Sequence, residues 1–236
     1  MRSRILPAVG VSALALVAAS AFAPSAVASK HSTPTATHQS SSKAHQTSVA
    51  KKYKKGCRVD QSDGDVGNAV SSQNFESDFD AYDDMAADDF MCNSKKKKVK
   101  VTNLYAYGDI TADQPGSFNV SIHEWDNSTP VGKVVCDSPG SNYTLSQGPP
   151  SEFQYNITLN SSCTLRKGVM YWLVVQANLD FLPNGSQWYW NLRQPINNDE
   201  GAWSNPGGGF GSCTDYGSIG DCVVGDGGDY DTVFQI

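Results

Sequence analysis

Short runs of alternating apolar and polar residues, separated by Gly, Pro, Asn, Asp and Ser, constrain the fold of this chain most strongly. Because side chains of a β-strand point alternately to its two faces, this period predicts strands that bury one face. Such runs occupy residues 85–91, 99–107, 117–125, 132–137, 152–159, 169–179, 186–193 and 231–236. They predict an all-β fold of about eight strands, an antiparallel β-sandwich with jelly-roll-like order.

Six cysteines lie between residues 57 and 222. An even number of cysteines in an exported chain indicates disulfides, and six cysteines allow fifteen pairings. Proximity favours Cys213–Cys222, and for the others we expect Cys57–Cys92 and Cys136–Cys163. The alternative is that the cysteines are free and buried, and export of the chain argues against it.

The N-terminal part of the chain divides into a leader and an arm. Residues 1–28 have a basic start, an apolar run and an Ala-x-Ala site, which predicts a cleaved secretory signal peptide and no transmembrane anchor. Residues 29–56 hold six lysines, no acid and few large apolar groups, which predicts a disordered basic arm. Residues 57–236 are then a single domain, and the mature protein is expected to be secreted and extracellular.

The charge of that domain limits its partners. Residues 57–236 carry all 24 acids and ten basic residues, a net charge of −14. A surface that binds nucleic acid must neutralise phosphates, so this balance argues against a nucleic-acid partner. The lysines at 51–55 and 95–98 are expected to be solvated; the alternative is that the tail, with the lysines at 51–55, touches an anionic wall polymer or membrane through charge alone.

Several motifs resemble a family of uncharacterised secreted bacterial domains. The resemblance rests on the early strand ADDF (87–90), the strand WLVVQANLDF (172–181) and the loop NPGGGFG before a cysteine, and it covers most of residues 70–236. It implies a β-sandwich and an exported location. Because the family has no agreed activity, the resemblance implies no mechanism. The lysine run at 95–98 departs from the shorter, less basic turn that is usual there.

Catalytic motifs are scarce. His123 is the one histidine of the domain, and its position between Ile122 and Glu124 predicts a surface residue of a strand. A glycosidase needs two carboxylates several ångströms apart, which 24 acids permit, although no spacing singles out a pair. We therefore expect no catalytic residue, and keep a secreted hydrolase as an alternative function.

Aromatic residues indicate a binding function more directly. Exposed rings beside Asn, Asp and Arg suit sugars, whose CH faces stack on rings while their hydroxyls bind polar groups. Trp188 and Trp190 share a strand face and are expected in the core, whereas Trp203 is expected in a surface loop. The candidate ligand-binding residues are Trp203, Tyr189, Asn205, Asp199 and Arg193.

These residues favour a non-catalytic binding or adhesion module for extracellular polysaccharide or a cell-wall polymer. A purely structural surface component is a further alternative. The oligomeric state does not follow from the sequence. In WSNPGGGFGSC (203–213), we expect Gly207–Gly209 to let the backbone pack closely on the rings of Trp203 and Phe210, rather than to bind phosphate.

Two acidic clusters predict a structural calcium ion. Asp88 and Asp89 lie near one end of the domain sequence, and Asp229 and Asp231 near the other. Terminal strands of a jelly roll commonly lie close together, which would bring like charges into repulsion unless a cation intervenes. Calcium binds six to eight oxygens of this kind. The alternative is that these aspartates cap turns, with Asp88 and Asp89 on opposite faces.

Deletion of residues 29–50 is expected to leave the midpoint of thermal unfolding unchanged, because their composition cannot bury apolar surface. Calorimetry of the full-length and shortened chains checks this. A large drop in the midpoint would show that the arm packs on the domain.

Overall fold

The computed structural model describes residues 56–126, 131–147 and 153–236, and β-strands make up most of its regular structure. The strands are β1 (Asp65–Ser71), β2 (Gln73–Asn74), β3 (Met85–Met91), β4 (Lys98–Ile110), β5 (Ser117–Glu124), β6 (Val134–Gln147), β7 (Phe153–Arg166), β8 (Met170–Asn178), β9 (Trp188–Arg193), β10 (Ala202–Ser204), β11 (Gly217–Ser218), β12 (Asp231–Thr232) and β13 (Phe234–Gln235). Two short helices, the 3₁₀ helix η2 (Ser77–Tyr82) and the π-helix η3 (Gly220–Val224), complete the described elements.

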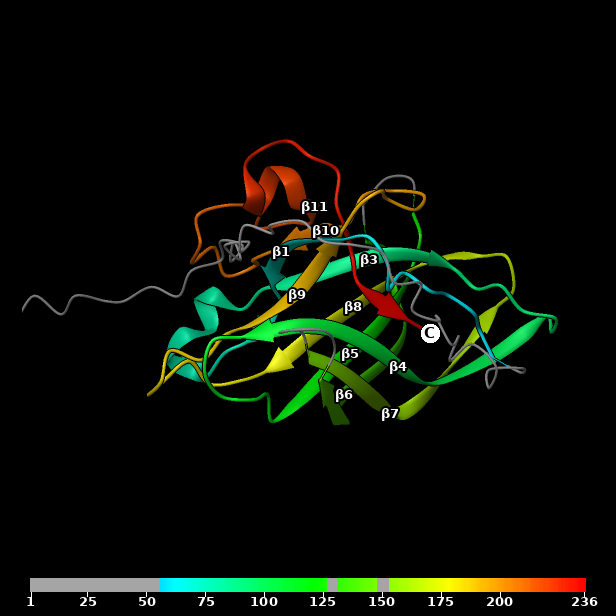
Figure 1. Ribbon diagram of the computed structural model, residues 1–236, viewed down its shortest axis with the longest axis horizontal. Coiled ribbons are helices and arrows are strands. Elements are labelled where there is room, and N and C mark those ends of the chain that lie inside the picture. Colours follow the sequence, from blue (N-terminus) through cyan, green and yellow to red (C-terminus); the bar gives the residue numbers. More distant parts are fainter. Residues whose placement is uncertain (1–55, 127–130, 148–152) are drawn as a thin grey trace, which may run out of the picture.

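The strands form one curled sheet, so the all-β prediction is confirmed but the jelly-roll sandwich of about eight strands is not. The order is β1-β9-β4-β7-β6-β5-β8-β3-β10-β11, with β12 beside β9, β13 beside β4 and β2 beside β8. Among the named strands all pairings are antiparallel except β2 with β8. Figure 1 shows the sheet curling so that its two halves face each other.

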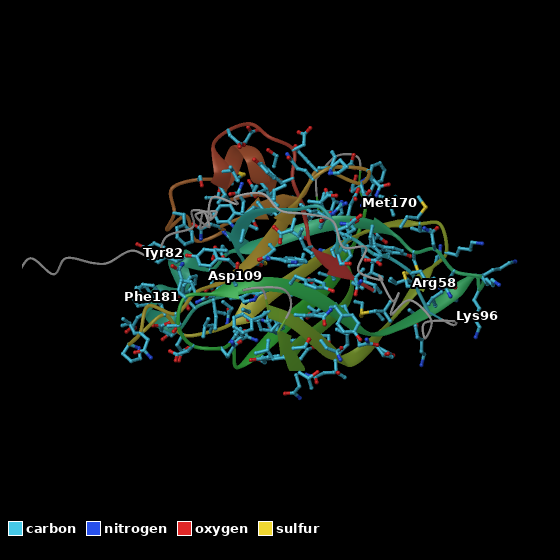
Figure 2. All side chains as sticks on the ribbon, viewed as in Figure 1. Arg58, Tyr82, Lys96, Asp109, Met170 and Phe181 are labelled. Carbon is cyan, nitrogen blue, oxygen red and sulfur yellow. A yellow bond between two sulfur atoms is a disulfide. The ribbon has the colours of Figure 1, made fainter. Side chains whose placement is uncertain are left out.

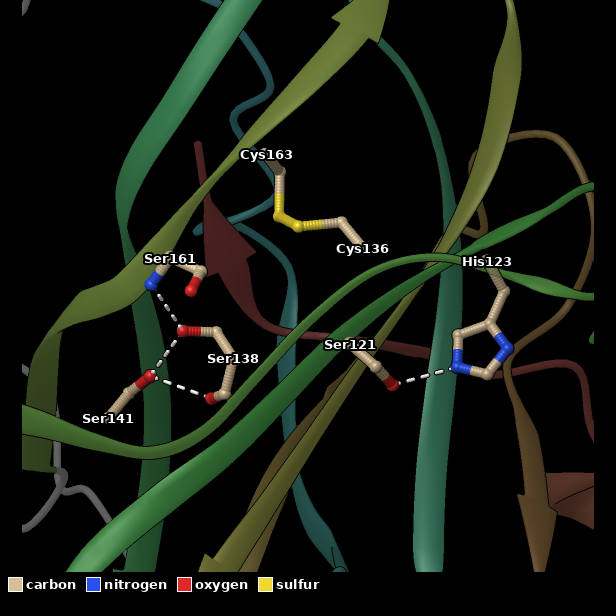
Figure 3. Close-up of a disulfide and its surroundings, with 7 residues drawn as sticks. All are labelled: Ser121, His123, Cys136, Ser138, Ser141, Ser161 and Cys163. Atoms are coloured by element: carbon tan, nitrogen blue, oxygen red, sulfur yellow. Dashed lines mark hydrogen bonds between the residues drawn. A yellow bond between two sulfur atoms is a disulfide. The ribbon is translucent and has the colours of Figure 1, made fainter.

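Strand β6 explains why the two halves are one sheet. Its first part pairs with β5 and its second part, from Asn142, pairs with β7. At the change of partner, Gly140 has a positive φ of 64° and the register with β5 shifts. The Ser138 and Ser141 hydroxyls lie 3.0 Å apart, and Ser161 of β7 donates its amide to Ser138 at 3.1 Å (Figure 3). These bonds hold the corner at which the sheet curls.

The core lies between the facing halves. Trp188 of β9 packs against Phe118 of β5 at 5.1 Å and Tyr155 of β7 at 5.9 Å between ring centroids. Trp190 contacts Phe234 of β13 at 6.2 Å. Trp188 and Trp190 are both fully buried, which confirms their predicted place in the core.

All three predicted disulfides are present, Cys57–Cys92, Cys136–Cys163 and Cys213–Cys222. The Cys136–Cys163 bond joins β6 to β7 close to the serine-lined corner (Figure 3). The disulfides are consistent with an extracellular protein.

Period-two patterning located β3, β4, β5, β8 and β9 well, but the predicted runs at 132–137 and 152–159 end far before β6 and β7 do. The run at 85–91 coincides with β3, while the run at 231–236 is divided between β12 and β13. The prediction missed β1, β2, β10 and β11. Three of these have two or three residues, too few to show an alternating pattern.

The glycine-rich loop after β10 packs against η2. A Cβ atom on Gly207 would lie 2.6 Å from the backbone of Ala81, and one on Gly209 would lie 2.8 Å from the Tyr82 ring. The Gly209 amide donates to the Ala81 carbonyl at 2.8 Å. Close approach of the glycine backbone to an aromatic ring is therefore found, but the ring is Tyr82 of η2 and not Trp203 or Phe210, which were predicted.

Replacement Gly207→Ala is expected to lower the free energy of unfolding by about 1–3 kcal/mol, because the new methyl group must displace the Ala81 backbone. Chemical denaturation measures this. The matched control is Gly56→Ala, since a Cβ at Gly56 meets no atom within 4 Å. Equal stability of the two variants would contradict the packing role.

Candidate functional site

Two of the predicted ligand-binding residues lie under the surface. Trp203 is in β10 and is 0% exposed, so its predicted place in a surface loop is wrong. Its ring packs on Phe210 at 6.0 Å, and its indole donates to the Ser71 carbonyl at 3.0 Å. Asn205 is also buried and donates to the carbonyls of Ala81 and Asp83 at 2.8 Å each. Both residues hold the glycine-rich loop against η2.

Tyr189 and Arg193, two further predicted ligand-binding residues, are buried in β9. The Tyr189 hydroxyl donates to the Gln187 side chain at 2.9 Å, and burial raises the pKa of Tyr189 to about 12. The Arg193 guanidinium donates to Asp231 at 3.2 Å and to Asp63 at 3.1 Å. Neither side chain is available to a ligand at the surface, which corrects the prediction.

Asp231 and Asp88 form a buried acidic pair where the last strands meet β3. Asp88 Oδ2 accepts hydrogen bonds from the amide and hydroxyl of Thr232 and from Gln61 Nε2. Burial raises the pKa of both carboxyls, and the charge of Asp231 raises that of Asp88 further. The segments of Asp88 and Asp231 therefore lie close together, as predicted, but their carboxyls meet in the interior of the protein.

The four aspartates predicted as calcium ligands do not gather around one point. Asp88 faces Thr232 in the interior, whereas Asp89, the next residue of β3, accepts from Asn198 and Asp199 on the other face. Asp229 is exposed. Within the three described stretches of the chain, no group of three or more His, Cys, Asp or Glu side chains could hold a metal ion. The alternation of β3 places Asp88 and Asp89 on opposite faces, and protein donors bind the carboxylates of Asp88, Asp89 and Asp231.

The carboxylates of Asp231 and Asp89 anchor the loop between β9 and β10. Asp231 Oδ2 accepts the Asn197 amide at 2.6 Å. Asp89 accepts the Asn198 side chain at 3.1 Å and the Asp199 amide at 3.0 Å. Two buried acceptors therefore fix three consecutive residues of this loop, and they leave the Asp199 side chain exposed.

Asp199 meets an exposed tryptophan from a different part of the chain. The indole Nε1 of Trp125 donates to Asp199 Oδ2 at 2.7 Å. Trp125 is 38% exposed, whereas the other four tryptophans are at most 3% exposed. Asp199 was predicted beside a tryptophan, and the structure pairs it with Trp125 instead of Trp203. We define the Trp125 site as Trp125, Asn198 and Asp199.

Pairing between β5 and the start of β6 fixes the position of Trp125. The Glu124 amide donates to the Lys133 carbonyl at 2.8 Å, and the Gly132 amide donates to the Glu124 carbonyl at 3.1 Å. His123 adds a third hydrogen bond between these two segments. Its Nδ1 lies 2.9 Å from the Gly132 carbonyl, and because a carbonyl can only accept, Nδ1 donates. As predicted, His123 lies on the outer face of its strand; its Nε2 contacts the Ser121 hydroxyl at 2.7 Å (Figure 3).

The electrostatics of the Trp125 site are acidic. Burial raises the pKa of Asp89, beneath the loop, to about 6, in spite of the donors from Asp199 and Asn198. Glu124 and Asp126 flank Trp125 in the chain. The site therefore combines a fixed ring, an exposed carboxylate and an amide in a region of negative charge.

Sequence reasoning missed Trp125. It directly follows the alternating run at 117–125 and precedes Asp126, Asn127 and Ser128, a composition typical of a turn. A large aromatic residue at the end of a strand and the start of a turn was the available signal. Its partner Asp199 lies 74 residues away, so the pairing itself could not be read from the chain.

No protein-family model, curated protein or solved structure matches this chain. The resemblance to secreted bacterial domains described above therefore stays a prediction. In the described part of the chain, no helix has both the length and the apolar character needed to cross a membrane.

Stability is expected to be higher at pH 5 than at pH 8. Burial raises the pKa of Asp84 to about 8 and that of the Asp88–Asp231 pair above its ordinary value. A raised folded-state pKa contributes stability that is fully present below the unfolded pKa near 4 and is lost as pH rises through the folded pKa. Calorimetry across this range checks the sign.

The variant Asp84→Asn tests one of these contributions, because an amide does not titrate. Its unfolding midpoint is expected to vary less with pH than that of the wild type. Asp78→Asn, at an exposed position of η2, is the matched control. A midpoint that rises from pH 5 to pH 8 in the wild type would refute the assignment.

Proposed function

We propose that this protein is an exported, non-catalytic β-sheet module that binds an extracellular or cell-surface glycan through the Trp125 site. The observation that carries the proposal is the exposed indole of Trp125, held by Asp199 at 2.7 Å. A ring fixed in this way offers a face for the CH groups of a sugar without losing rotamer freedom on binding.

The polar groups of the site supply hydrogen bonds beside the ring. A carboxylate has about four acceptor positions, so Asp199 can accept from sugar hydroxyls while it holds the indole. Asn198 and Asp199 belong to a loop anchored from below by Asp89 and Asp231. Anchored polar groups favour binding, because little further ordering is needed.

The charge of the site restricts the glycan. Asp199 contacts the Trp125 indole, and Glu124 and Asp126 are its neighbours in the chain, in a domain of net charge −14. An acidic polysaccharide would be repelled by these carboxylates. The ligand class is therefore a neutral glycan or one that carries amino groups.

Export is the second part of the proposal. It is supported by the predicted signal peptide at residues 1–28 and by the three disulfides, which form in oxidising compartments. A protein outside the cell meets polysaccharide before most other ligands of this chemistry.

The hydrolase alternative receives less support from the geometry. A glycosidase needs two carboxyls that flank an accessible bond. Asp88 and Asp231 are one close pair of carboxyls, and both are 0% exposed. Their donors, Thr232 and Arg193, assign them a structural role.

Replacement Trp125→Ala is expected to weaken glycan binding about tenfold or more, because the stacking surface is lost. A glycan array of neutral, amino and acidic sugars identifies the ligand for the full chain, and calorimetry then measures the affinity of each variant. Asp199→Asn is expected to weaken binding less, since the amide oxygen can still accept the indole N–H.

The matched control is Leu182→Ala, which removes an exposed apolar side chain in another loop. Its affinity should equal that of the wild type. All three variants should unfold at similar temperatures, because the changed side chains are exposed. Unaltered glycan binding by Trp125→Ala, or no binding of the wild type to any array sugar, would reject the proposal.

A further inference from the structure

One end of the domain concentrates its positive charge. Residues 90–108 contain five lysines and no acid, and residues 153–179 contain two basic residues and no acid. The basic side chains at this end are Lys95, Lys96, Lys97, Lys98, Lys100, Arg166 and Lys167, all exposed. We call this group the basic tip. It holds seven of the ten basic residues of a domain whose net charge is −14.

Two adjacent turns form the basic tip. Lys98 of β4 pairs with Arg166 of β7, and the Lys167 amide donates to the Lys97 carbonyl at 3.0 Å. The turn between β3 and β4 is therefore side by side with the turn between β7 and β8. Figure 2 shows Lys96 at the extreme end of the molecule, far from Tyr82 and Phe181 at the other end.

The basic tip rests on a fixed base. The Cys57–Cys92 disulfide links the N-terminal segment to the residue at the end of β3, just before the lysine run. The Gly168 amide donates to the Cys92 carbonyl at 3.2 Å, which links the turn between β7 and β8 to the same point. This places Arg58, an exposed residue adjacent to Cys57, near the same end (Figure 2). The cations are thus held together by strand pairing and a disulfide.

Exposed apolar side chains lie among these cations. Met91 is 38% exposed and Val169 is 40% exposed. Met91 pairs with Met170 across β3 and β8, which places it beside the Lys167–Val169 turn. Cations that surround apolar side chains match the interface of an anionic bilayer, where cations meet headgroups and apolar groups enter the acyl boundary.

The negative charge of the domain does not cancel this attraction. The next acid along β4 after Lys100 is Asp109, about 30 Å away at the rise of a strand. The nearer acids include the exposed Asp60 and Asp137, the buried and hydrogen-bonded Asp89, and Glu124 at the end of β5, and the seven cations of the basic tip outnumber them. Because the Debye length is about 8 Å at physiological ionic strength, the basic tip dominates the field at a surface that it touches.

We propose that the basic tip docks end-on onto an anionic phospholipid surface. Lysine and arginine side chains bind the headgroups, and Met91 and Val169 enter the interface. This binding uses residues separate from the Trp125 site, so either activity can be absent while the other remains. A lipid surface is favoured over a soluble polyanion by the two apolar side chains, which a polymer of charged groups would leave in water.

Vesicle flotation tests the proposal with the full chain. The probes are vesicles of phosphatidylcholine alone and vesicles with 30% phosphatidylglycerol, a composition chosen for the assay. The wild type should bind the anionic vesicles and not the neutral ones. Replacing Lys95, Lys96, Lys97 and Lys98 with Gln should lower the partition coefficient more than tenfold, since each cation near the surface contributes about fivefold.

The matched control replaces Lys51, Lys52, Lys54 and Lys55 with Gln, which removes the same charge from the predicted arm. It should retain the wild-type partition coefficient within about threefold. Equal loss in both variants would show that total charge, and not the tip, governs binding, and loss in the control alone would assign binding to the arm. Both results overturn the proposal, as does a wild type that fails to bind anionic vesicles.

The pair Met91→Ser and Val169→Ser distinguishes a lipid surface from a soluble polyanion. This variant keeps every charge, and it should lose several-fold in vesicle binding, most clearly at 0.5 M salt, chosen to screen the cations. Vesicle binding unaltered by the two serines, together with equally tight binding of soluble polyphosphate, would overturn the lipid assignment in favour of an anionic polymer.

Discussion

The buried contact of Asp231 with Arg193 and the Asn197 amide is the interaction on which the rest of the structure most depends. It ties β12 to β9 and to the loop that follows β9. A buried ion pair contributes little net stability, because desolvation offsets the Coulomb attraction, but loss of one partner is costly. Its main effect is therefore geometric: it fixes β12 against β9 and the loop that directly follows β9, which lie 34 to 38 residues earlier in the sequence.

The Trp125 site follows from that arrangement. Asp231 and Asp89 hold the loop after β9, which presents Asp199 to the indole of Trp125. The acidic residues that suggested a metal site thus act as acceptors for backbone and side-chain donors. Their burial raises their pKa values, which links the geometry of the site to pH through the stability of the whole domain.

The molecule has an uneven distribution of charge and exposed apolar groups. The glycine-rich loop, η2 and the acids around it form one end, and the basic tip forms the other (Figure 2). A domain that binds a surface through one end would keep its orientation, since the acidic remainder is repelled by the same anionic surface. The Trp125 site and the basic tip use different residues and could act together.

Local pattern was enough to predict many features. The alternation in β3, β5 and β8 predicted their positions closely, because two-residue periodicity survives in the sequence wherever one face is buried. Proximity in the chain predicted Cys213–Cys222, whereas Cys57–Cys92 and Cys136–Cys163 were chosen among the remaining pairings without a signal that singled them out. The core position of Trp188 and Trp190 followed from their shared strand face.

Other features depend on contacts between distant segments. Trp203 was expected in a loop, since the glycines after it indicate one, but β3 and β11 pair with it and bury it. The sheet continues through β6 because that strand changes partner at Gly140, which no local pattern shows. Strands of two residues have no period, so their pairing comes entirely from the tertiary structure.

The sequence by itself determined that this is an all-β, disulfide-linked domain with a basic segment and exposed acids, because composition and periodicity are local properties. The tertiary structure alone decided which aspartates are buried, which tryptophan is exposed and which loops lie side by side. Those outcomes depend on pairings such as Trp125 with Asp199, 74 residues apart. The free energy that stabilises these pairings comes from packing of the whole sheet, so no single stretch of the chain encodes them.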